Sequence, residues 1–379
     1  MTGIYIHIPF CKQACSYCDF YFSTRKQLID PFVKALIIEI ESYRDTQFSK
    51  NPVKTIYLGG GTPSLLNEQH LASIFEALHS VFDTDPEEVT IEVNPDDVSD
   101  EYLKMLIRLD VDRLSMGIQS FQQELLTFMH RAHSREEALK ALESIQKTGF
   151  PAFTADLIYG NPGQSVQMLE KDIQQLLLFD PPHVSAYSLT VEPKTRLGKQ
   201  VELGRIRPPD DEVVAEHFDC VESILRDGGL QRYEVSNFAK SGREAHHNSN
   251  YWNHRNYIGF GPSAHSFWWD NTAARRWNNR ADLKKYLASP AADVVEESEI
   301  IPLHSLAEER LFLGLRTIWG VSETELKDRY QYELSDLQLE WIHQQTGSGV
   351  ITFDDKILKM TGTGLKISDL LVVDLLSKK

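Results

Sequence analysis

The stretch that decides the fold is Tyr5–Phe20, with the sequence YIHIPFCKQACSYCDF. Its opening residues are mostly apolar, as in a buried strand, and they lead directly into Cys11, Cys15 and Cys18. The spacing is C-x3-C-x2-C, and these are three of the four cysteines in 379 residues. Thiolates this close in sequence can converge on one object from a single loop, so the pattern favours an iron–sulfur cluster. On a [4Fe-4S] cubane, three thiolates leave one iron open to a further ligand.

Three simpler explanations of the cysteines compete with this interpretation. A disulfide needs paired cysteines and a secreted context, and neither is present. A structural zinc site needs a fourth ligand and usually C-x2-C pairs, and the sequence has no second pair. Chance clustering is the third explanation. The tight spacing directly after a strand favours the cluster over all three.

The cysteine motif resembles the signature of the radical S-adenosylmethionine (SAM) superfamily. The wider pattern Y-I-H-I-P-F-C-x3-C-x-Y-C-x-F resembles one group within it, which holds the coproporphyrinogen dehydrogenases and the HemW haem chaperones. The resemblance implies that Cys11, Cys15 and Cys18 bind a [4Fe-4S] cluster. It also implies that the amino and carboxylate groups of SAM chelate the open iron.

The composition describes an acidic chain of moderate length. At 379 residues and 41% hydrophobic content it can bury a sizeable core, and we expect two or three domains. The sequence contains no signal-peptide pattern and no apolar run long enough for an integral membrane segment, and its few clustered cysteines fit a reducing compartment. We therefore expect a cytoplasmic protein. A formal net charge of −16 argues against nucleic-acid binding, because phosphate contacts need a basic face.

Strand-like and helix-like segments alternate through the first two thirds of the chain, which predicts an α/β fold with parallel strands and helical crossovers. The expected strands are Ile4–Ile8, Thr55–Leu58, Val89–Val93, Arg113–Ile118, Phe153–Ile158 and His183–Leu189. The expected helices are Leu28–Arg44, Glu68–Phe82, Ser99–Leu109, Ser134–Thr148 and Ser165–Phe179. This pattern alone fits either a doubly wound sheet or a partial barrel. The resemblance implies a partial (β/α)6 radical-SAM barrel over residues 1–209, with its site at the C-terminal strand ends.

Glycines and a carboxylate mark the second and third expected strands. The glycine loop consists of Gly59, Gly60, Gly61 and Thr62. Glycine permits unusual backbone angles and lets a ligand approach the backbone, although a simple tight turn would have the same sequence. Glu92 interrupts an apolar strand, where a carboxylate needs a partner unless it lies on a solvated edge or in a salt bridge. The resemblance implies that these residues and Arg131 bind the amino-acid end of SAM, since an arginine fork suits a carboxylate.

Polar side chains also stand in the fourth and fifth expected strands. Gln119 ends one strand, and Asp156 lies within the apolar run of the next. Buried polar groups need partners, and the two hydroxyls of a ribose would serve. The resemblance implies that Gln119 and Asp156 bind the SAM ribose. It further implies that Ile158 and Ala186 flank the adenine and that Tyr5 and Tyr17 pack around the ligand. All four residue types are also ordinary in a protein core.

Beyond Leu189 the composition changes, and residues 191–209 look like a linker rich in Pro, Gly and basic residues. Asp210 or Asp211 is expected to cap a helix that runs to about Asp227. Residues 210–300 are then expected to form an α+β extension of the barrel.

The segment A-H-H-N-S-N-Y-W within this extension is rich in histidine, asparagine and aromatic residues. Imidazole ligates haem iron and aromatic rings pack on a porphyrin, whereas a polar turn with an aromatic anchor is the structural alternative. H-N-x-x-Y-W resembles a motif of the HemW-type haem chaperones. The haem-binding residues that the resemblance implies are His247, Asn248, Tyr251 and Trp252, with His246, His254 and His265 as alternatives.

Residues 301–379 are expected to form a winged-helix-like module. The expected helices are Leu306–Leu315, Ser322–Tyr330 and Leu334–Gln345, and the expected hairpin pairs Gly349–Phe353 with Lys356–Thr361. DNA binding is disfavoured, because the third helix carries Asp336 and Glu340 instead of a basic face. We expect this module to pack on the barrel or to cover a substrate.

Two functions compete within the resemblance. One is oxygen-independent coproporphyrinogen III dehydrogenase, which cleaves SAM to a 5′-deoxyadenosyl radical and decarboxylates two propionates in porphyrin biosynthesis. Phe20 stands where that enzyme's pattern has a further cysteine, and the enzyme's N-terminal extension is missing. H-N-x-x-Y-W favours a haem chaperone that binds the cluster, SAM and haem and delivers haem to acceptor haemoproteins. A flavodoxin- or ferredoxin-type reductant is a further expected partner, and the charge disfavours a third class, DNA-binding regulators with an iron–sulfur sensor.

Overall fold

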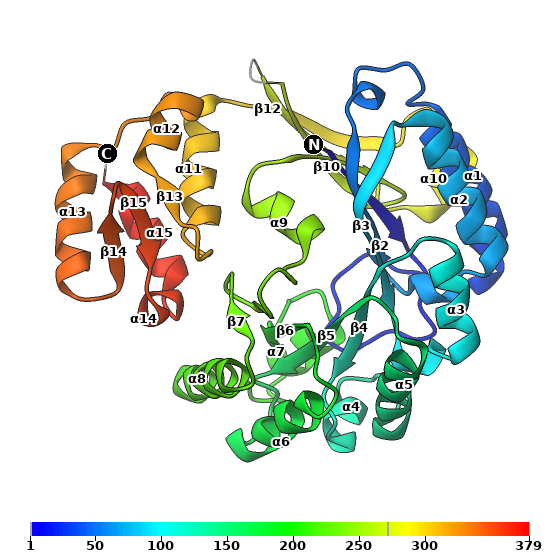
Figure 1. The fold of residues 1–379 in the computed structure, drawn as a ribbon, viewed down its shortest axis with the longest axis horizontal. Helices are drawn as coiled ribbons and strands as arrows, with labels where there is room; N and C mark the ends of the chain where they lie inside the picture. The colour runs from blue at the N-terminus through cyan, green and yellow to red at the C-terminus, as the bar shows by residue number, and fades with distance from the viewer. Residues whose placement is uncertain (1, 271–272, 379) are drawn as a thin grey trace.

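The structure, a computed structural model, describes residues 2–270 and 273–378 (Figure 1). In this part of the chain, one sheet has the strand order β12-β11-β10-β9-β1-β2-β3-β4-β5-β6-β8-β7. The six parallel strands in its middle are β1 (Thr2–Ile8), β2 (Val53–Gly60), β3 (Thr84–Val93), β4 (Arg113–Gln119), β5 (Ala152–Tyr159) and β6 (His183–Ser188). All six expected strands are confirmed.

Strands β1 to β6 lie side by side in the order of the sequence, whereas a doubly wound sheet would reverse its order at one point. Strands β1 and β6 do not pair with each other, so the structure is the expected partial (β/α)6 barrel. The crossover helices are α1 (Ile29–Glu41), α2 (Glu68–Val81), α3 (Asp100–Arg108), α5 (Arg135–Thr148) and α6 (Val166–Leu177), with a short α4 (Gln123–Phe128) before α5. Figure 1 shows them along the outer side of the sheet.

Side-chain hydrogen bonds fix where these helices begin. Asn67, Ser99, Ser134 and Ser165 each accept a backbone N–H from the first turn of α2, α3, α5 and α6 respectively. The caps of α2, α3 and α6 follow the loop that leaves the preceding strand, whereas the cap of α5 follows α4. The caps therefore fix the points at which the loops at the carboxyl ends of the strands enter the helices.

The extension adds strands at both edges of the barrel sheet. Its elements are β7 (Gln231–Arg232), β8 (Asn237–Ala239), α9 (His246–Trp252), β9 (Asn256–Phe260), β10 (His265–Trp269), β11 (Ala274–Asn279), α10 (Leu283–Ala288) and β12 (Val295–Ile301). Strand β9 pairs in parallel with β1, and β8 runs antiparallel to β6. The sheet thus continues across residue 209, and the domain boundaries stay a prediction.

The expected linker needs a correction, because residues 191–209 contain the helix α7 (Arg196–Glu202), which is too short to show a hydrophobic period. The next helix, α8 (Asp211–Asp227), begins where expected. Asp210 occupies its N-cap position, yet its carboxylate pairs with Arg207 at 3.0 Å and caps no backbone N–H.

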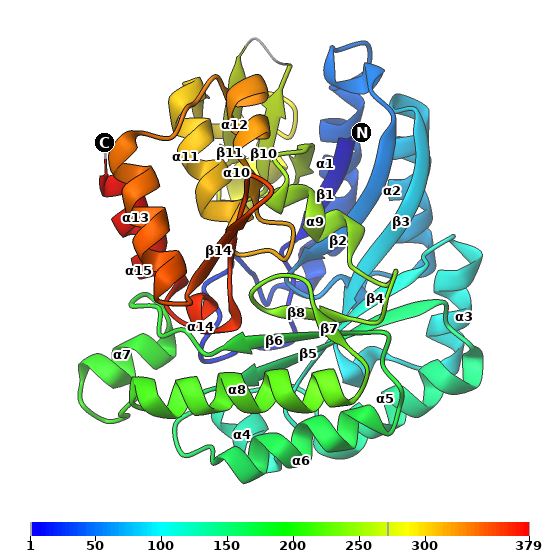
Figure 2. The same ribbon diagram turned by 60° about the vertical axis from the view of Figure 1, so that its left-hand side comes forward.

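The C-terminal module has the expected three helices and hairpin. Its elements are α11 (Leu303–Gly314), β13 (Val321–Ser322), α12 (Glu323–Tyr330), α13 (Asp336–Gly347), β14 (Ile351–Asp354), β15 (Ile357–Met360), α14 (Gly362–Leu365) and α15 (Ser368–Ser377). The short strand β13 and the helices α14 and α15 are not predicted from the sequence. Figures 1 and 2 show the module beside the extension. One apolar core joins the two, since Phe267 and Trp269 of β10 pack with Leu306 and Leu311 of α11.

Candidate functional site

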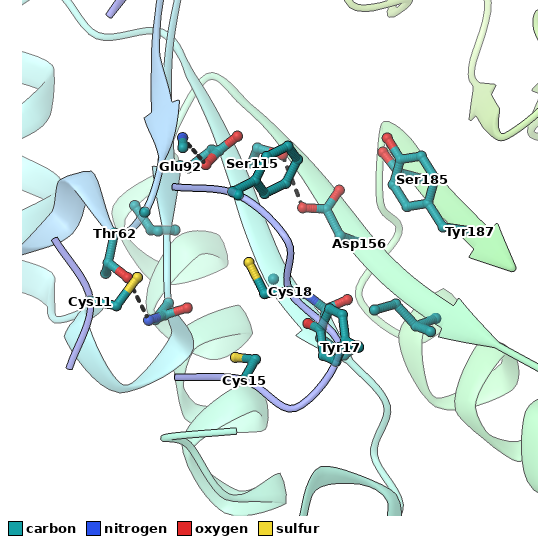
Figure 3. A pocket seen from close by; sticks show the side chains of 18 of the residues that line it. Cys11, Cys15, Tyr17, Cys18, Thr62, Glu92, Ser115, Asp156, Ser185 and Tyr187 are labelled. Atoms are coloured by element: carbon teal, nitrogen blue, oxygen red, sulfur yellow. Dashed lines mark hydrogen bonds between the residues drawn. The ribbon is translucent and has the colours of Figure 1, made fainter. Parts of the chain in front are cut away.

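A cavity of about 560 Å³ lies inside the barrel toward the carboxyl ends of β2 to β6. Successive side chains of a strand point to opposite faces, so alternate residues reach the cavity. In β5, Thr154, Asp156 and Ile158 line it, whereas Ala155 and Leu157 lie in the core under the helices. The same alternation brings in residues of the neighbouring strands, among them Glu92, Ser115, Ser185 and Tyr187 (Figure 3).

The loop with the three cysteines borders this cavity and is anchored from outside through Ser16. The Ser16 backbone N–H donates to the Met129 carbonyl at 3.0 Å, and its hydroxyl donates to the Phe128 carbonyl at 3.1 Å. Its own carbonyl accepts the N–H of Leu197 at 2.7 Å. These three bonds fix the backbone between the second and third cysteines.

Cys11, Cys15 and Cys18 all line the cavity with free thiols. Burial raises the pKa of Cys11 and raises that of Cys18 to about 12, so both stay protonated until a metal displaces the proton. Arg131 donates to the sulfur of Cys15 at 3.4 Å. Among the described residues, no three metal-ligating side chains converge on a single metal ion. A cubane is larger than one ion, and three free thiols around one cavity fit it.

The glycine loop after β2 packs its backbone against the end of β1. The Gly61 N–H donates to the Ile8 carbonyl at 2.9 Å, and a Cβ on Gly61 would lie 2.6 Å from that same oxygen. Gly60 has a φ of 101°, and its Cβ would strike the ring of His7. Only glycine fits either position. Gly60, Gly61 and Thr62 consequently form a wall of the cavity.

Two carboxyl groups inside the cavity form no salt bridge with any cation among the described residues. Glu92 accepts the Tyr57 hydroxyl and the Gly60 N–H, both at 2.9 Å, and Asp156 accepts the Ser115 hydroxyl at 3.0 Å. Burial raises the pKa of Glu92 to about 7 and that of Asp156 to about 6. A ligand with a cationic group and hydroxyl donors would stabilise both carboxylates in their charged form.

Gln119 and Arg131 present polar atoms that no protein group satisfies. Gln119 has a φ of 66°, in the left-handed region that non-glycine residues rarely adopt, and its Oε1 is buried without a hydrogen-bond partner. Arg131 donates to Asn94 and to the Gly117 carbonyl, both at 2.8 Å, while its buried Nε has no partner. Unpaired buried polar atoms are costly, and the side chains of Gln119 and Arg131 line a cavity that a polar ligand can fill.

Three residues expected at the SAM site lie outside the cavity lining. Ala186 faces the apolar core, because its strand neighbours Ser185 and Tyr187 take the cavity face. Tyr5 lies behind Tyr57, with ring centroids 6.1 Å apart. Gly59 makes room for Glu92, whose carboxylate a Cβ there would meet at 2.7 Å. The roles of all three at SAM stay predictions.

The structure places His247 in a hydrogen-bonded network and not at the cavity wall. Its side chain is 1% exposed, with Nδ1 2.9 Å from the Thr55 hydroxyl and Nε2 2.8 Å from the Tyr251 hydroxyl. Its ring stacks on Tyr57 at 5.1 Å, and its backbone N–H donates to Glu88 at 2.8 Å. Burial lowers the pKa of His247 to about 3. Haem ligation by His247 stays a prediction, and it would require breaking one of the two ring bonds.

The other expected haem residues are distributed around α9. Asn248 lines the large cavity, and Tyr251 lines a second cavity of about 360 Å³ between α9 and α11. Trp252 is half-buried and lines neither. Of the alternatives, His254 borders the second cavity, whereas His246 and His265 are exposed.

Several residues of the large cavity are not predicted from the sequence. They include Tyr57, Thr90, Asn94, Arg113, Ser115, Thr154, Ser185 and Tyr187. Most are polar residues at alternate positions of apolar strands. The two-residue period that predicts each strand therefore also indicates which of its residues face the cavity.

Two family models match this chain. The model described as the radical SAM superfamily matches residues 5–176, and that of the HemN C-terminal domain matches residues 301–367. The Bacillus subtilis protein named "Heme chaperone HemW" is 35% identical over 371 residues, which cover 96% of each chain. The Bos taurus protein "Radical S-adenosyl methionine domain-containing protein 1, mitochondrial" is 31% identical over all of this chain and 88% of its own.

Among solved structures, coproporphyrinogen III oxidase (HemN) from Escherichia coli, described as a radical SAM enzyme, superposes with a TM-score of 0.85. The match covers 99% of this chain and 89% of that one, at 20% identity. It supports the overall fold, including the C-terminal module.

Proposed function

The chain belongs to the HemW family of the radical SAM superfamily, and on that premise we propose that it is a haem chaperone. It would bind a [4Fe-4S] cluster through Cys11, Cys15 and Cys18, together with SAM and haem, and pass haem to acceptor haemoproteins. The observation that carries the proposal is one cavity lined by three free thiols and by the carboxyl groups of Glu92 and Asp156. When bound, the cluster supplies one electron at a time.

The cavity's own residues divide into two ends that suit SAM. At the cluster end, Glu92 is available to accept an ammonium and Arg131 to donate to a carboxylate. Further along the wall, Gln119 and Asp156 suit the ribose hydroxyls, and Ile158 offers an apolar contact to the adenine. Tyr17 lines the same space from the cysteine loop. The protein would thus bind, orient and shield SAM beside the open iron.

Haem would bind in the cavity between α9 and α11. The rings of Tyr251, Tyr257, Phe267 and Phe312 line that cavity, and aromatic rings suit a porphyrin face. The Nε2 of His254 lies 3.5 Å from Glu309, whereas the ring nitrogens of His247 are held at 2.9 Å and 2.8 Å, so His254 Nε2 is the more available to iron. Arg255, exposed at the same cavity, suits a propionate.

The charge of the large cavity disfavours the dehydrogenase as the alternative. Coproporphyrinogen carries four propionates, whereas the only described cations that line the cavity are Arg113 and Arg131. Arg113 pairs with Glu88 at 2.8 Å, and Arg131 is engaged with Asn94. Phe20, at the position of that enzyme's further cysteine, is 65% exposed at the rim.

The test is anaerobic reconstitution of the cluster, followed by haem titration and, separately, incubation with coproporphyrinogen, SAM and a reductant. We expect one haem per chain, transfer of that haem to an apo-haemoprotein, and no protoporphyrinogen. Arg255→Ala should weaken haem binding several-fold, whereas the exposed Arg135→Ala on α5 should not. Decarboxylation of coproporphyrinogen would overturn the proposal.

We place this activity in the cytoplasm, because free, clustered thiols need a reducing compartment. None of the described helices is long and apolar enough to cross a membrane.

A further inference from the structure

His254 occupies an unusual backbone position just after α9. The helix ends in a Schellman motif, in which the His254 N–H donates to the Tyr251 carbonyl at 3.4 Å. The Arg255 N–H completes the motif by donating to the Asn250 carbonyl at 3.0 Å. His254 is the residue after the C-cap and has a φ of 48°, in the left-handed region where glycine is usual. A side chain kept at a strained position points to a function for that side chain.

The C-terminal module holds the backbone around His254. Arg329 of α12 donates to the Asn253 carbonyl at 3.5 Å and to the His254 carbonyl at 3.1 Å. Arg310 of α11 donates to the Trp252 carbonyl at 3.4 Å. These carbonyls lie at the C-terminal end of α9, where a helix lacks partners of its own and favours cations. The end of α9 is thus held from the module, and Figure 1 shows α9 between the strands of the barrel and α11.

The module also fixes the imidazole ring. The hydroxyl of Tyr330, in α12, lies 3.0 Å from His254 Nδ1, and both side chains are buried. The His254 ring also stacks on Phe267 of β10, with centroids 5.5 Å apart. Of the two ring nitrogens, Nε2 is the one left for a ligand. It lies 3.5 Å from Glu309, and both His254 and Glu309 line the second cavity.

This arrangement is typical of a histidine that binds a metal. Such a histidine gives its other ring N–H to an acceptor, which fixes the tautomer and the ring orientation and raises the basicity of the ligating nitrogen. With its proton on Nδ1, His254 donates to the Tyr330 oxygen and keeps the lone pair of Nε2 free. Glu309 has Arg276 as its main partner, since Arg276 donates to its two oxygens at 3.1 Å and 2.6 Å.

We propose that Tyr330 is the positioning residue of the haem ligand, because it accepts the Nδ1–H of His254 and so directs Nε2 to the iron. This rests on the proposed function, since it requires haem in the second cavity. The C-terminal module is then part of the haem site, with Tyr330 at the ring of His254 and Arg329 at its backbone. Loss of the Tyr330 hydroxyl leaves a ligand that is less basic and less firmly oriented.

The test compares two tyrosine variants of the module in cluster-loaded protein. Tyr330→Phe removes the hydroxyl at His254 Nδ1. The matched control Tyr332→Phe removes a hydroxyl that accepts from Gln338 at 2.9 Å, away from the residues that line the second cavity. Haem affinity is measured by titration, the midpoint potential of the bound haem by a redox titration of its absorption bands, and axial ligation by electron paramagnetic resonance of ferric haem.

We expect Tyr330→Phe to bind haem about tenfold more weakly than the wild type. The midpoint potential of its haem should rise, because a less basic imidazole stabilises ferric iron less. Tyr332→Phe should change neither value, although each variant loses a hydrogen bond of similar kind. Equal haem affinity and equal potential in the two variants would overturn the inference, since a hydroxyl with a structural role alone affects only stability.

A second variant, His254→Ala, tests the ligand itself. It should lose the resonance signature of histidine ligation, and added imidazole should restore that signature by filling the space of the missing ring. A wild-type haem spectrum in His254→Ala would overturn the inference and leave haem binding, and with it the proposed function, intact. A wild-type protein that binds no haem would overturn the proposed function as well.

Discussion

The large cavity and the helix α9 both hold residues expected to bind ligands, yet their polar atoms are satisfied to different degrees. In the cavity, Gln119 Oε1 and Arg131 Nε are buried without partners, and burial raises the pKa of Glu92 and of Asp156. In α9, both ring nitrogens of His247 are hydrogen-bonded within the protein. Gln119 and Arg131 thus keep hydrogen-bonding capacity for a ligand at the cavity, whereas the ring of His247 has none left.

The two regions are also joined. His247 stacks on Tyr57, whose hydroxyl donates to Glu92 at 2.9 Å, and Glu92 in turn accepts the Gly60 N–H. The H-N-x-x-Y-W segment therefore supports the wall on which the amino-acid end of SAM is expected. Variants of the two regions should separate a ligand role from a supporting role.

The largest expected effect is loss of the cluster. Cys15→Ser should lack the visible absorption of a [4Fe-4S] cluster after anaerobic reconstitution, because a serine oxygen is a poor substitute for a thiolate on iron. The fold should persist, since the loop backbone is fixed through Ser16. Cys220→Ser, in α8, is the matched control and should keep the full cluster. A complete cluster in Cys15→Ser would show that this cysteine is no ligand.

The next effect distinguishes a buried support from a haem ligand. His247→Ala removes two buried hydrogen bonds and a stacked ring, and should lower the free energy of unfolding of the cluster-free protein by about 2–4 kcal/mol. Chemical denaturation measures this, with the exposed His246→Ala as control. SAM affinity should fall as well, because Tyr57 and Glu92 lose their support.

Unchanged stability together with a changed haem absorption spectrum in His247→Ala would reverse this assignment. His247 would then be the ligand that the motif suggests. A side chain whose hydrogen bonds are all made within the protein would then bind haem, and hydrogen-bond satisfaction would no longer distinguish the two regions.

Sequence alone predicts the six strands and the cysteine loop because both are local signals. A carboxylate such as Asp156 in an apolar strand is visible without knowing the partner strand. The side of the sheet on which a residue lies is harder to predict. Ala186 and Tyr187 are neighbours, yet one faces the core under the helices and the other faces the cavity.

His247 shows the stronger limit. A haem site and a fully hydrogen-bonded polar network can both consist of histidine, asparagine and tyrosine. The difference lies in Thr55, 192 residues away in sequence, which supplies a hydrogen bond that no local pattern reveals. Whether a polar motif binds a ligand or supports the fold thus depends on contacts with residues that are distant in sequence.

A smaller effect follows the ionisation of Glu92. Its pKa is raised to about 7 in the fold by burial, so folding favours the protonated form. The stability that this protonation contributes is complete below the unfolded pKa of about 4.3 and is lost as pH rises toward 7. Glu92→Gln cannot ionise and should gain about 2–3 kcal/mol on the wild type between pH 5 and pH 8, measured on cluster-free protein. A pH-independent difference would show that Glu92 does not titrate there.

The smallest effect tests one bond of the α9 network. Tyr251→Phe removes the hydroxyl that bonds to His247 Nε2 at 2.8 Å while keeping the aromatic ring, so the expected loss is about 1 kcal/mol of unfolding free energy. Tyr257→Phe is the control, because its ring centroid lies 4.7 Å from that of Tyr251 and its hydroxyl makes no hydrogen bond to a described residue. In the double variant Tyr251→Phe/His247→Ala the two losses should not add, since both remove the same bond. Full additivity would mean that the Tyr251 hydroxyl contributes to stability through a group other than His247.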